Sequence, residues 1–239
     1  MTIATEKSSQ KFSRRRDGWY FLPGDKKYAS VTTILDVLAK PALINWAAKT
    51  AASLVLADPD EYDSAQKAAA GIYQVRDRAA DRGSMVHSMI EALFRGAPVE
   101  TDSMPEHVRG YYAAFWSWVA ATQPKPVYAE TNVYSDKHGY AGTLDLIAAF
   151  PDKKLKMKDF KTSSGIYPEM GLQLEAYRNC DFILPRGQDP TPIPMPPVAE
   201  TGIVLLMPDG TYMDRPMRGD LEVFLALKRV WEWSKSSGR

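Results

Sequence analysis

Two aspartates and a lysine occur on neighbouring strand-like segments in the middle of this 239-residue chain. Asp145 lies in the apolar run of residues 142–150, where an unpaired carboxylate would be costly. Asp159 and Lys161 lie in the next such run, and strand alternation puts both on one face, with Phe160 on the other. The residues between the two aspartates suffice for a hairpin that brings their carboxylates together.

The chemistry that suits this group is metal-assisted hydrolysis of a phosphodiester. Two close carboxylates repel unless a cation lies between them, and oxygen ligands of this kind suit Mg²⁺ or Mn²⁺. A nearby lysine stabilises the charge that develops on phosphate, or orients and deprotonates water. Asp159 and Lys161 alone are compatible with a surface cross-strand pair. The apolar surroundings of Asp145 favour the metal site.

Further motifs accompany these residues in a fixed order along the chain. Residues 82–87 read Arg-Gly-Ser-Met-Val-His, and residues 173–177 read Gln-Leu-Glu-Ala-Tyr. With Asp145 and the Asp-X-Lys element of residues 159–161, they resemble the PD-(D/E)XK nuclease superfamily, in its RecB-like and phage-exonuclease branch. The motifs span residues 82–177, and residues 30–35 are similar to phage members as well. A lone Asp-X-Lys element is a weak signal, whereas the ordered set is a strong one.

The resemblance implies a fold and a set of site residues. The fold would be α/β (mixed α+β), a restriction-endonuclease-like core with a central mixed β-sheet flanked by helices and an N-terminal helical region. The catalytic residues would be Asp145, Asp159 and Lys161. The metal ligands would be His87, Asp145, Asp159 and the main-chain carbonyl of Phe160. Residues that contact DNA or support the site would be Arg82, Gln173, Tyr177 and Glu130.

Each outer residue also has a simpler interpretation. A single helical histidine such as His87 is more often a core residue, and only the resemblance favours a ligand. Gln173 and Tyr177 share one helix face; they either contact DNA and support the lysine, or pack the helix on the sheet through a hydrogen-bonded phenol. Arg82 either binds phosphate or pairs with an adjacent aspartate, 77 or 81. Glu130 is either an outer metal ligand or a solvent-facing strand residue.

Composition sets limits on the class of protein. Formal net charge is only +1, but residues 1–27 hold seven Lys/Arg against three Asp/Glu, which attracts phosphate locally. The single cysteine, Cys180, excludes a disulfide framework and a four-cysteine Fe–S cluster within one chain, and with it the cluster-bearing members of the branch. No apolar run approaches the roughly 20 residues of a membrane helix, and no secretory signal is visible. We therefore expect a cytoplasmic protein without membrane association.

The chain divides into three parts by pattern. Residues 1–27 are expected to be a flexible basic N-terminal arm, and residues 28–239 a single nuclease domain. Its mainly helical part is residues 28–123, and its catalytic α/β core is residues 124–239. Expected helices cover residues 30–38, 42–57, 61–95 (with Gly71 an interruption), 105–121, 168–183 and 220–233; expected strands cover residues 19–22, 127–134, 140–150, 155–160 and 199–207, with a loop over 185–197. The aromatic residues of 105–121 are expected in the core rather than on a stacking surface.

The resulting functional hypothesis is a Mg²⁺- or Mn²⁺-dependent deoxyribonuclease, and an exonuclease rather than an endonuclease. It would act on duplex ends or single strands in recombination, repair or phage DNA processing, with a single-strand-annealing or recombination protein as a candidate partner. Three alternatives stay open: a catalytically inactive nucleic-acid-binding protein of the same fold, a structure-specific endonuclease, and an enzyme acting on another phosphoester.

Overall fold

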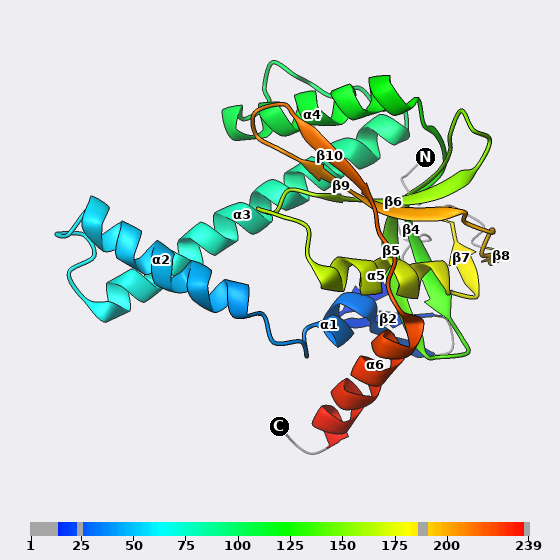
Figure 1. Cartoon of the computed structure of the whole chain (residues 1–239), viewed down its shortest axis with the longest axis horizontal. Coiled ribbons are helices and arrows are strands. Elements are labelled where there is room, and N and C mark those ends of the chain that lie inside the picture. Colours follow the sequence, from blue (N-terminus) through cyan, green and yellow to red (C-terminus); the bar gives the residue numbers. More distant parts are fainter. Residues whose placement is uncertain (1–13, 23–25, 186–190, 237–239) are drawn as a thin grey trace, which may run out of the picture.

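The computed structural model describes residues 14–22, 26–185 and 191–236 (Figure 1). Its helices are α1 (Val31–Leu35), α2 (Pro41–Ala57), α3 (Ala65–Phe94), α4 (Glu106–Thr122), α5 (Pro168–Arg178) and α6 (Leu221–Ser236). Its strands are β1 (Arg14–Arg16), β2 (Trp19–Phe21), β3 (Lys27–Ser30), β4 (Lys125–Ser135), β5 (Tyr140–Ala149), β6 (Leu155–Lys161), β7 (Phe182–Leu184), β8 (Ile193–Pro194), β9 (Glu200–Leu206) and β10 (Tyr212–Pro216). The expectation of a mixed α/β fold with a central mixed sheet flanked by helices is confirmed.

Strand β5 is the centre of the sheet. It pairs antiparallel with β4 along one edge. Its other edge is shared by two strands: β3 pairs in parallel with Tyr140 and Ala141, and β6 pairs antiparallel with residues 146–149. Among the described pairings, residues 142–145 of β5 therefore have no strand on that edge. The sheet forks there, and Asp145 lies at the fork.

Helices cover both faces of the sheet. Helices α1, α5 and α6 pack on one apolar cluster that includes Leu144, Met157 and Leu174. Helix α4 and the C-terminal half of α3 pack on another, which includes Phe115, Trp118 and Phe160. The aromatic residues of α4 thus lie mainly in the core, as expected, although Trp116 is 42% exposed. The two layers hold β5 and β6 between them.

Helix α2 and the N-terminal half of α3 project together from the body of the molecule (Figure 1). Helix α3 has 30 residues, which at a rise of 1.5 Å per residue gives a length of about 45 Å. Gly71 does not interrupt it. The absence of a side chain at this position leaves room for Tyr62 and for Leu54 of α2. Only the C-terminal half of α3 lies over the sheet, and it carries His87 to the fork.

Other local expectations are corrected by the structure. Residues 14–21, counted within the flexible arm of residues 1–27, form the β1–β2 hairpin, in which β2 matches the strand expected over residues 19–22, while residues 1–13 lie outside the described part. Within the loop expected over residues 185–197, Ile193–Pro194 form the short strand β8, which pairs with β7. The helix expected over 30–38 is the single turn of α1. The helix expected over 168–183 ends at Arg178, because Asp181 N donates to Tyr134 O and the next residues join β4 as β7.

In the part of the chain that the structure describes, no helix combines the length and the apolar character needed to cross a membrane.

Candidate metal centre and active site

Three side chains from three elements converge at the fork of the sheet. His87 comes from α3, Glu130 from β4 and Asp145 from β5. His87 Nδ1 lies 3.5 Å from Glu130 Oε1 and 3.6 Å from Asp145 Oδ2. One ligand atom from each of the three residues lies within 4.8 Å of the others. This triad contains one imidazole and two carboxylates.

The backbone of Glu130 departs from the strand around it. Its φ is +46°, in the left-handed region that a residue with a side chain seldom adopts. The residues on either side, Ala129 and Thr131, pair normally with Leu146 and Leu144 of β5, so the irregularity is confined to the position opposite Asp145. Backbone strain of this kind persists where the surroundings enforce it and is concentrated at functional sites.

A second group of polar side chains surrounds Asp159 on β6. Asp159 is 2% exposed, and its Oδ2 lies 2.5 Å from Lys161 Nζ. Its Oδ1 accepts a 3.0 Å hydrogen bond from Gln173 Nε2 of α5. The same Nε2 donates to Tyr177 OH at 3.2 Å. Asp159 and Lys161 thus share one face of β6, as strand alternation predicted.

One hydrogen bond joins the two groups. Asp145 Oδ2 accepts from the backbone N–H of Phe160 at 2.7 Å, which bridges β5 and β6 where their ladder has ended. The N–H and C=O of one strand residue point to the same edge, so the carbonyl of Phe160 also faces this gap. The Phe160 side chain packs in the opposite layer, against Phe115 and Trp118.

Burial and proximity shift the proton affinities of the site. Burial lowers the pKa of His87, but the carboxylates of Asp145 and Glu130 outweigh it and raise that pKa to about 9. Burial and the charge of Asp159 raise the pKa of Asp145 to about 7. Burial lowers the pKa of Lys161, but Asp159 and Asp145 raise it overall. In the metal-free protein, protons therefore offset the crowded negative charge.

The donor set fits a divalent cation. Ligand atoms around an ion with bonds of about 2.0–2.2 Å lie at most about 4.0–4.4 Å apart, somewhat less than the 4.8 Å within which the three donor atoms lie, so the triad would contract on binding an ion. Glu130 Oε1 is buried and makes no hydrogen bond, although His87 Nδ1 lies 3.5 Å away; a bound cation or water would complete this carboxylate. Carboxylates suit Mg²⁺ and Mn²⁺, while an imidazole ligand favours a transition metal; of the two, Mn²⁺ is the better match.

The contacts of the outer residues bear on the two interpretations that the sequence left open for each of them. Gln173 and Tyr177 are linked by a hydrogen bond and hold Asp159, which matches a supporting role within the site. Asp77 pairs with Arg76 instead of Arg82, and no ion pair joins Arg82 to Asp81 among the described residues. The Arg82 guanidinium lies 5.6 Å from the centre of the Tyr111 ring, and its buried Nε has no hydrogen-bond partner.

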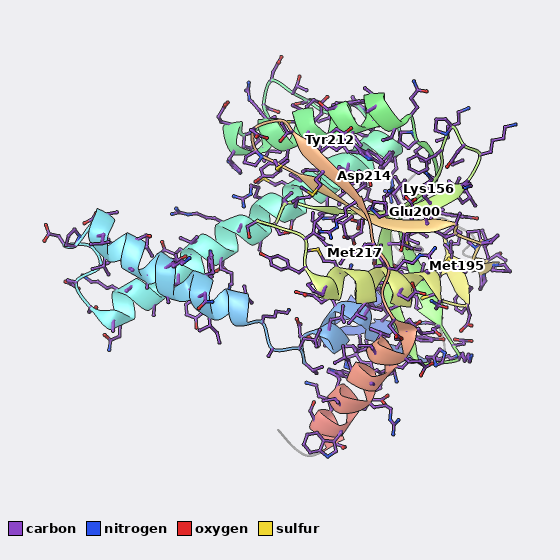
Figure 2. The ribbon with its side chains drawn as sticks, in the orientation of Figure 1. Lys156, Met195, Glu200, Tyr212, Asp214 and Met217 are labelled. Carbon is purple, nitrogen blue, oxygen red and sulfur yellow. The ribbon has the colours of Figure 1, made fainter. Side chains whose placement is uncertain are left out.

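Lys158, one residue before Asp159, belongs to a different cluster. It is 3% exposed, and its Nζ lies 2.7 Å from Asp214 Oδ1 and 3.2 Å from Glu200 Oε1. Asp214 Oδ2 accepts from Trp118 Nε1 at 2.8 Å. Figure 2 labels Glu200 and Asp214 on β9 and β10. This group joins those strands to α4 on the face of β6 opposite Asp159.

Of the two interpretations of Glu130, an outer metal ligand and a solvent-facing strand residue, its place beside His87 and Asp145 matches the first. One further feature of the site was not anticipated from the residues. Gly142 lies against the ring of Tyr177; its position three residues before Asp145 was the only signal that could have singled it out.

Comparison of the chain with models of known protein families gave no match, and comparison with curated proteins gave none either.

Proposed function

We propose that this protein is a metal-dependent deoxyribonuclease of the PD-(D/E)XK type that degrades DNA from its ends. The observation that carries the proposal is the convergence of His87, Glu130 and Asp145 beside the Asp159–Lys161 pair. A triad of metal-binding donors next to a lysine provides the groups needed for metal-assisted hydrolysis of a phosphodiester. The order of the motifs along the chain, read as a resemblance, supports DNA as the substrate.

Each residue of the site would have a separate role in hydrolysis. His87, Glu130 and Asp145 would hold the ion, joined by Asp159 and the Phe160 carbonyl. When bound, the ion lowers the pKa of water and neutralises charge on the phosphate. Lys161 Nζ would exchange its contact with Asp159 for one with the attacking water or a phosphate oxygen. Arg82, whose Nε has no partner, would bind an adjacent phosphate, which is where a guanidinium binds strongly.

Contacts of this kind read no bases. A guanidinium or an ammonium on phosphate positions DNA without distinguishing its sequence, and the sequence contains no recognisable helix-turn-helix or zinc-finger motif. This supports action on ends over cleavage at a recognition sequence. Binding is then expected to weaken steeply as salt concentration rises, because phosphate contacts release counterions.

The test is a cleavage assay with the full chain on four substrates: linear duplex, the same plasmid as a covalently closed circle, single-stranded linear DNA and single-stranded circular DNA. Each is incubated with Mn²⁺, Mg²⁺ or EDTA. The expected result is metal-dependent release of nucleotides from linear DNA, faster with Mn²⁺, and inert circles. Asp145→Asn is expected to abolish it, and Asp214→Asn, which alters an acid on the opposite face of β6, to preserve it.

Two results would contradict parts of this proposal in different ways. Cleavage of the closed circle as fast as the linear form, or into discrete fragments, excludes the action on ends and leaves the metal centre standing. Absence of hydrolysis of every substrate in every metal by folded protein excludes the nuclease itself.

A further inference from the structure

Gly142 on β5 lies directly beneath the ring of Tyr177. A methyl group at position 142 would lie 2.9 Å from Cζ and 3.0 Å from Cδ1 of that ring, and closer still to Cε1. Non-bonded carbon atoms pack at about 3.5–4.0 Å, so the ring has its place only because this position has no side chain. The φ of Gly142 is not positive, unlike that of Gly139 nearby. The backbone does not require glycine here; the ring does.

The ring and its hydroxyl move together, and the hydroxyl is tied to the metal centre. Tyr177 OH accepts from Gln173 Nε2, which also donates to Asp159 Oδ1. Gln173 and Tyr177 are one turn apart on α5. A ring displaced from Gly142 would carry its hydroxyl away from Gln173 and leave the amide with a single partner to hold it on Asp159.

Strand β5 is held on either side of position 142, although among the described pairings position 142 itself has a strand on one edge alone. Ala141 is paired on both sides, with Ser30 of β3 and Tyr134 of β4. Thr143 Oγ1 donates to Asn132 Oδ1 at 2.8 Å and is hydrogen-bonded to Tyr20 OH at 2.9 Å. Both neighbours of Gly142 are thus fixed. Any group added at position 142 must displace the ring of Tyr177, which is itself 3% exposed.

We propose that Gly142 is a positioning residue of the metal centre: its missing side chain seats Tyr177 so that Gln173 holds Asp159 in place. This inference rests on the proposed metal-dependent function. It assigns to β5 a second contribution to the site, three residues before Asp145 and acting from β5 through α5. Residues that orient metal ligands in this way typically change metal affinity or activity about 10–100-fold when altered, and a displacement of about 1 Å can cost a similar factor in rate.

The test measures binding of Mn²⁺ to the full-length protein without DNA, by titration calorimetry and by the paramagnetic signal of the free ion. Gly142→Ala is expected to raise the Kd for Mn²⁺ at least tenfold. Wild-type protein that binds no Mn²⁺ would remove the proposed function; wild-type binding with unchanged affinity in folded Gly142→Ala overturns only the role of Gly142.

Matched variants separate positioning from packing. Gly110→Ala, which would overlap the Pro208 carbonyl between α4 and the β9–β10 turn, is expected to lower stability and leave the Kd for Mn²⁺ unchanged. In a Tyr177→Ala background, Gly142→Ala is expected to change the Kd less than twofold; an equal effect in both backgrounds overturns the proposal. Should Gly142→Ala not fold, Tyr177→Phe keeps the ring and removes the hydroxyl, and wild-type Mn²⁺ affinity in that variant overturns it as well.

Discussion

Asp145 Oδ2 accepts a hydrogen bond from the backbone N–H of Phe160 across the gap between β5 and β6. The backbone pairing between β5 and β6 ends before Phe160, so its N–H has no backbone partner on β5. A buried donor without a partner is costly. Asp145 therefore completes the sheet at its fork, in addition to the metal-binding role proposed for its carboxylate. The same hydrogen bond holds the backbone of Phe160 beside the triad.

This double role separates two substitutions at one position. Asp145→Asn keeps an oxygen acceptor for the Phe160 N–H, whereas Asp145→Ala leaves it unpaired. We expect Asp145→Ala to unfold about 1–3 kcal/mol more easily than Asp145→Asn, measured by urea denaturation in EDTA, with cleavage abolished in both. Because both substitutions remove the negative charge of position 145, equal stability of the two variants would show that the hydrogen bond to the Phe160 N–H contributes no measurable stability.

Stability of the metal-free protein is expected to depend on pH through the same carboxyl. The pKa of Asp145 is raised to about 7 in the folded state, so the folded protein holds this proton more tightly than the unfolded chain. Its contribution to stability is complete below the unfolded value near 4 and is lost as pH rises through 7. The melting temperature in EDTA is expected to fall over that window and to fall less in Asp145→Asn; identical profiles would contradict it.

Glu130 is expected to matter for metal affinity more than its surface-strand sequence suggests. Glu130→Gln preserves shape but removes the charge of a buried Oε1 that has no hydrogen-bond partner. We expect a rise of about 10–100-fold in the Kd for Mn²⁺, measured by calorimetry. Glu91→Gln on α3, which alters the surface pair with Arg95, is the control and should bind Mn²⁺ as the wild type does.

Lys161 is expected to affect rate and not metal binding. Its contact with Asp159 neutralises that carboxylate, so Lys161→Met leaves Asp159 at least as available to a cation. We expect a fall in kcat of about 10²–10³-fold, the cost of losing one electrostatic contact to the transition state, with an unchanged or lower Kd for Mn²⁺. A variant that loses Mn²⁺ affinity and rate in parallel would assign Lys161 to the architecture of the site.

The sequence predicted the placement of the inner residues of the site better than that of the outer ones. Asp145, Asp159 and Lys161 could be placed because strand alternation and a hairpin follow from residue pattern alone. The position of Glu130 could not, since it depends on a left-handed φ within β4 that no residue pattern announces. The room that Gly142 gives to Tyr177 is likewise a contact between distant segments.

Elements whose residues show a local periodic pattern could be predicted from the sequence. Elements that form through pairing with distant strands could not. Alternating apolar residues indicated β5 and β6, and helical periodicity indicated α4. The segment after Arg178 continues the helical pattern, but β4 offers its residues backbone partners and they become β7. In the β1–β2 hairpin, β2 consists of the aromatic residues 19–21 and was expected as a strand, whereas the basic residues 14–16 of β1 are held by pairing with β2; propensity gives way to tertiary context at β7 and at β1.

Lys158 and Lys161 lie on either side of Asp159 in the sequence, and their side chains lie on opposite faces of β6. Lys161 faces the candidate metal centre, while Lys158 lies on the other face between Asp214 and Glu200. Removing one member of a fully buried ion pair costs about 3–5 kcal/mol; Glu200 and Asp214 are 35% and 20% exposed, so water compensates part of that cost. Lys158→Met is therefore expected to lower the free energy of unfolding by less than that amount, measured in urea. Because its Nζ points away from Asp159, the fraction that remains folded should bind Mn²⁺ and cleave linear DNA as the wild type does. Loss of Mn²⁺ affinity in folded Lys158→Met would show that the two faces of β6 are coupled, and would contradict the separation drawn between the two lysines.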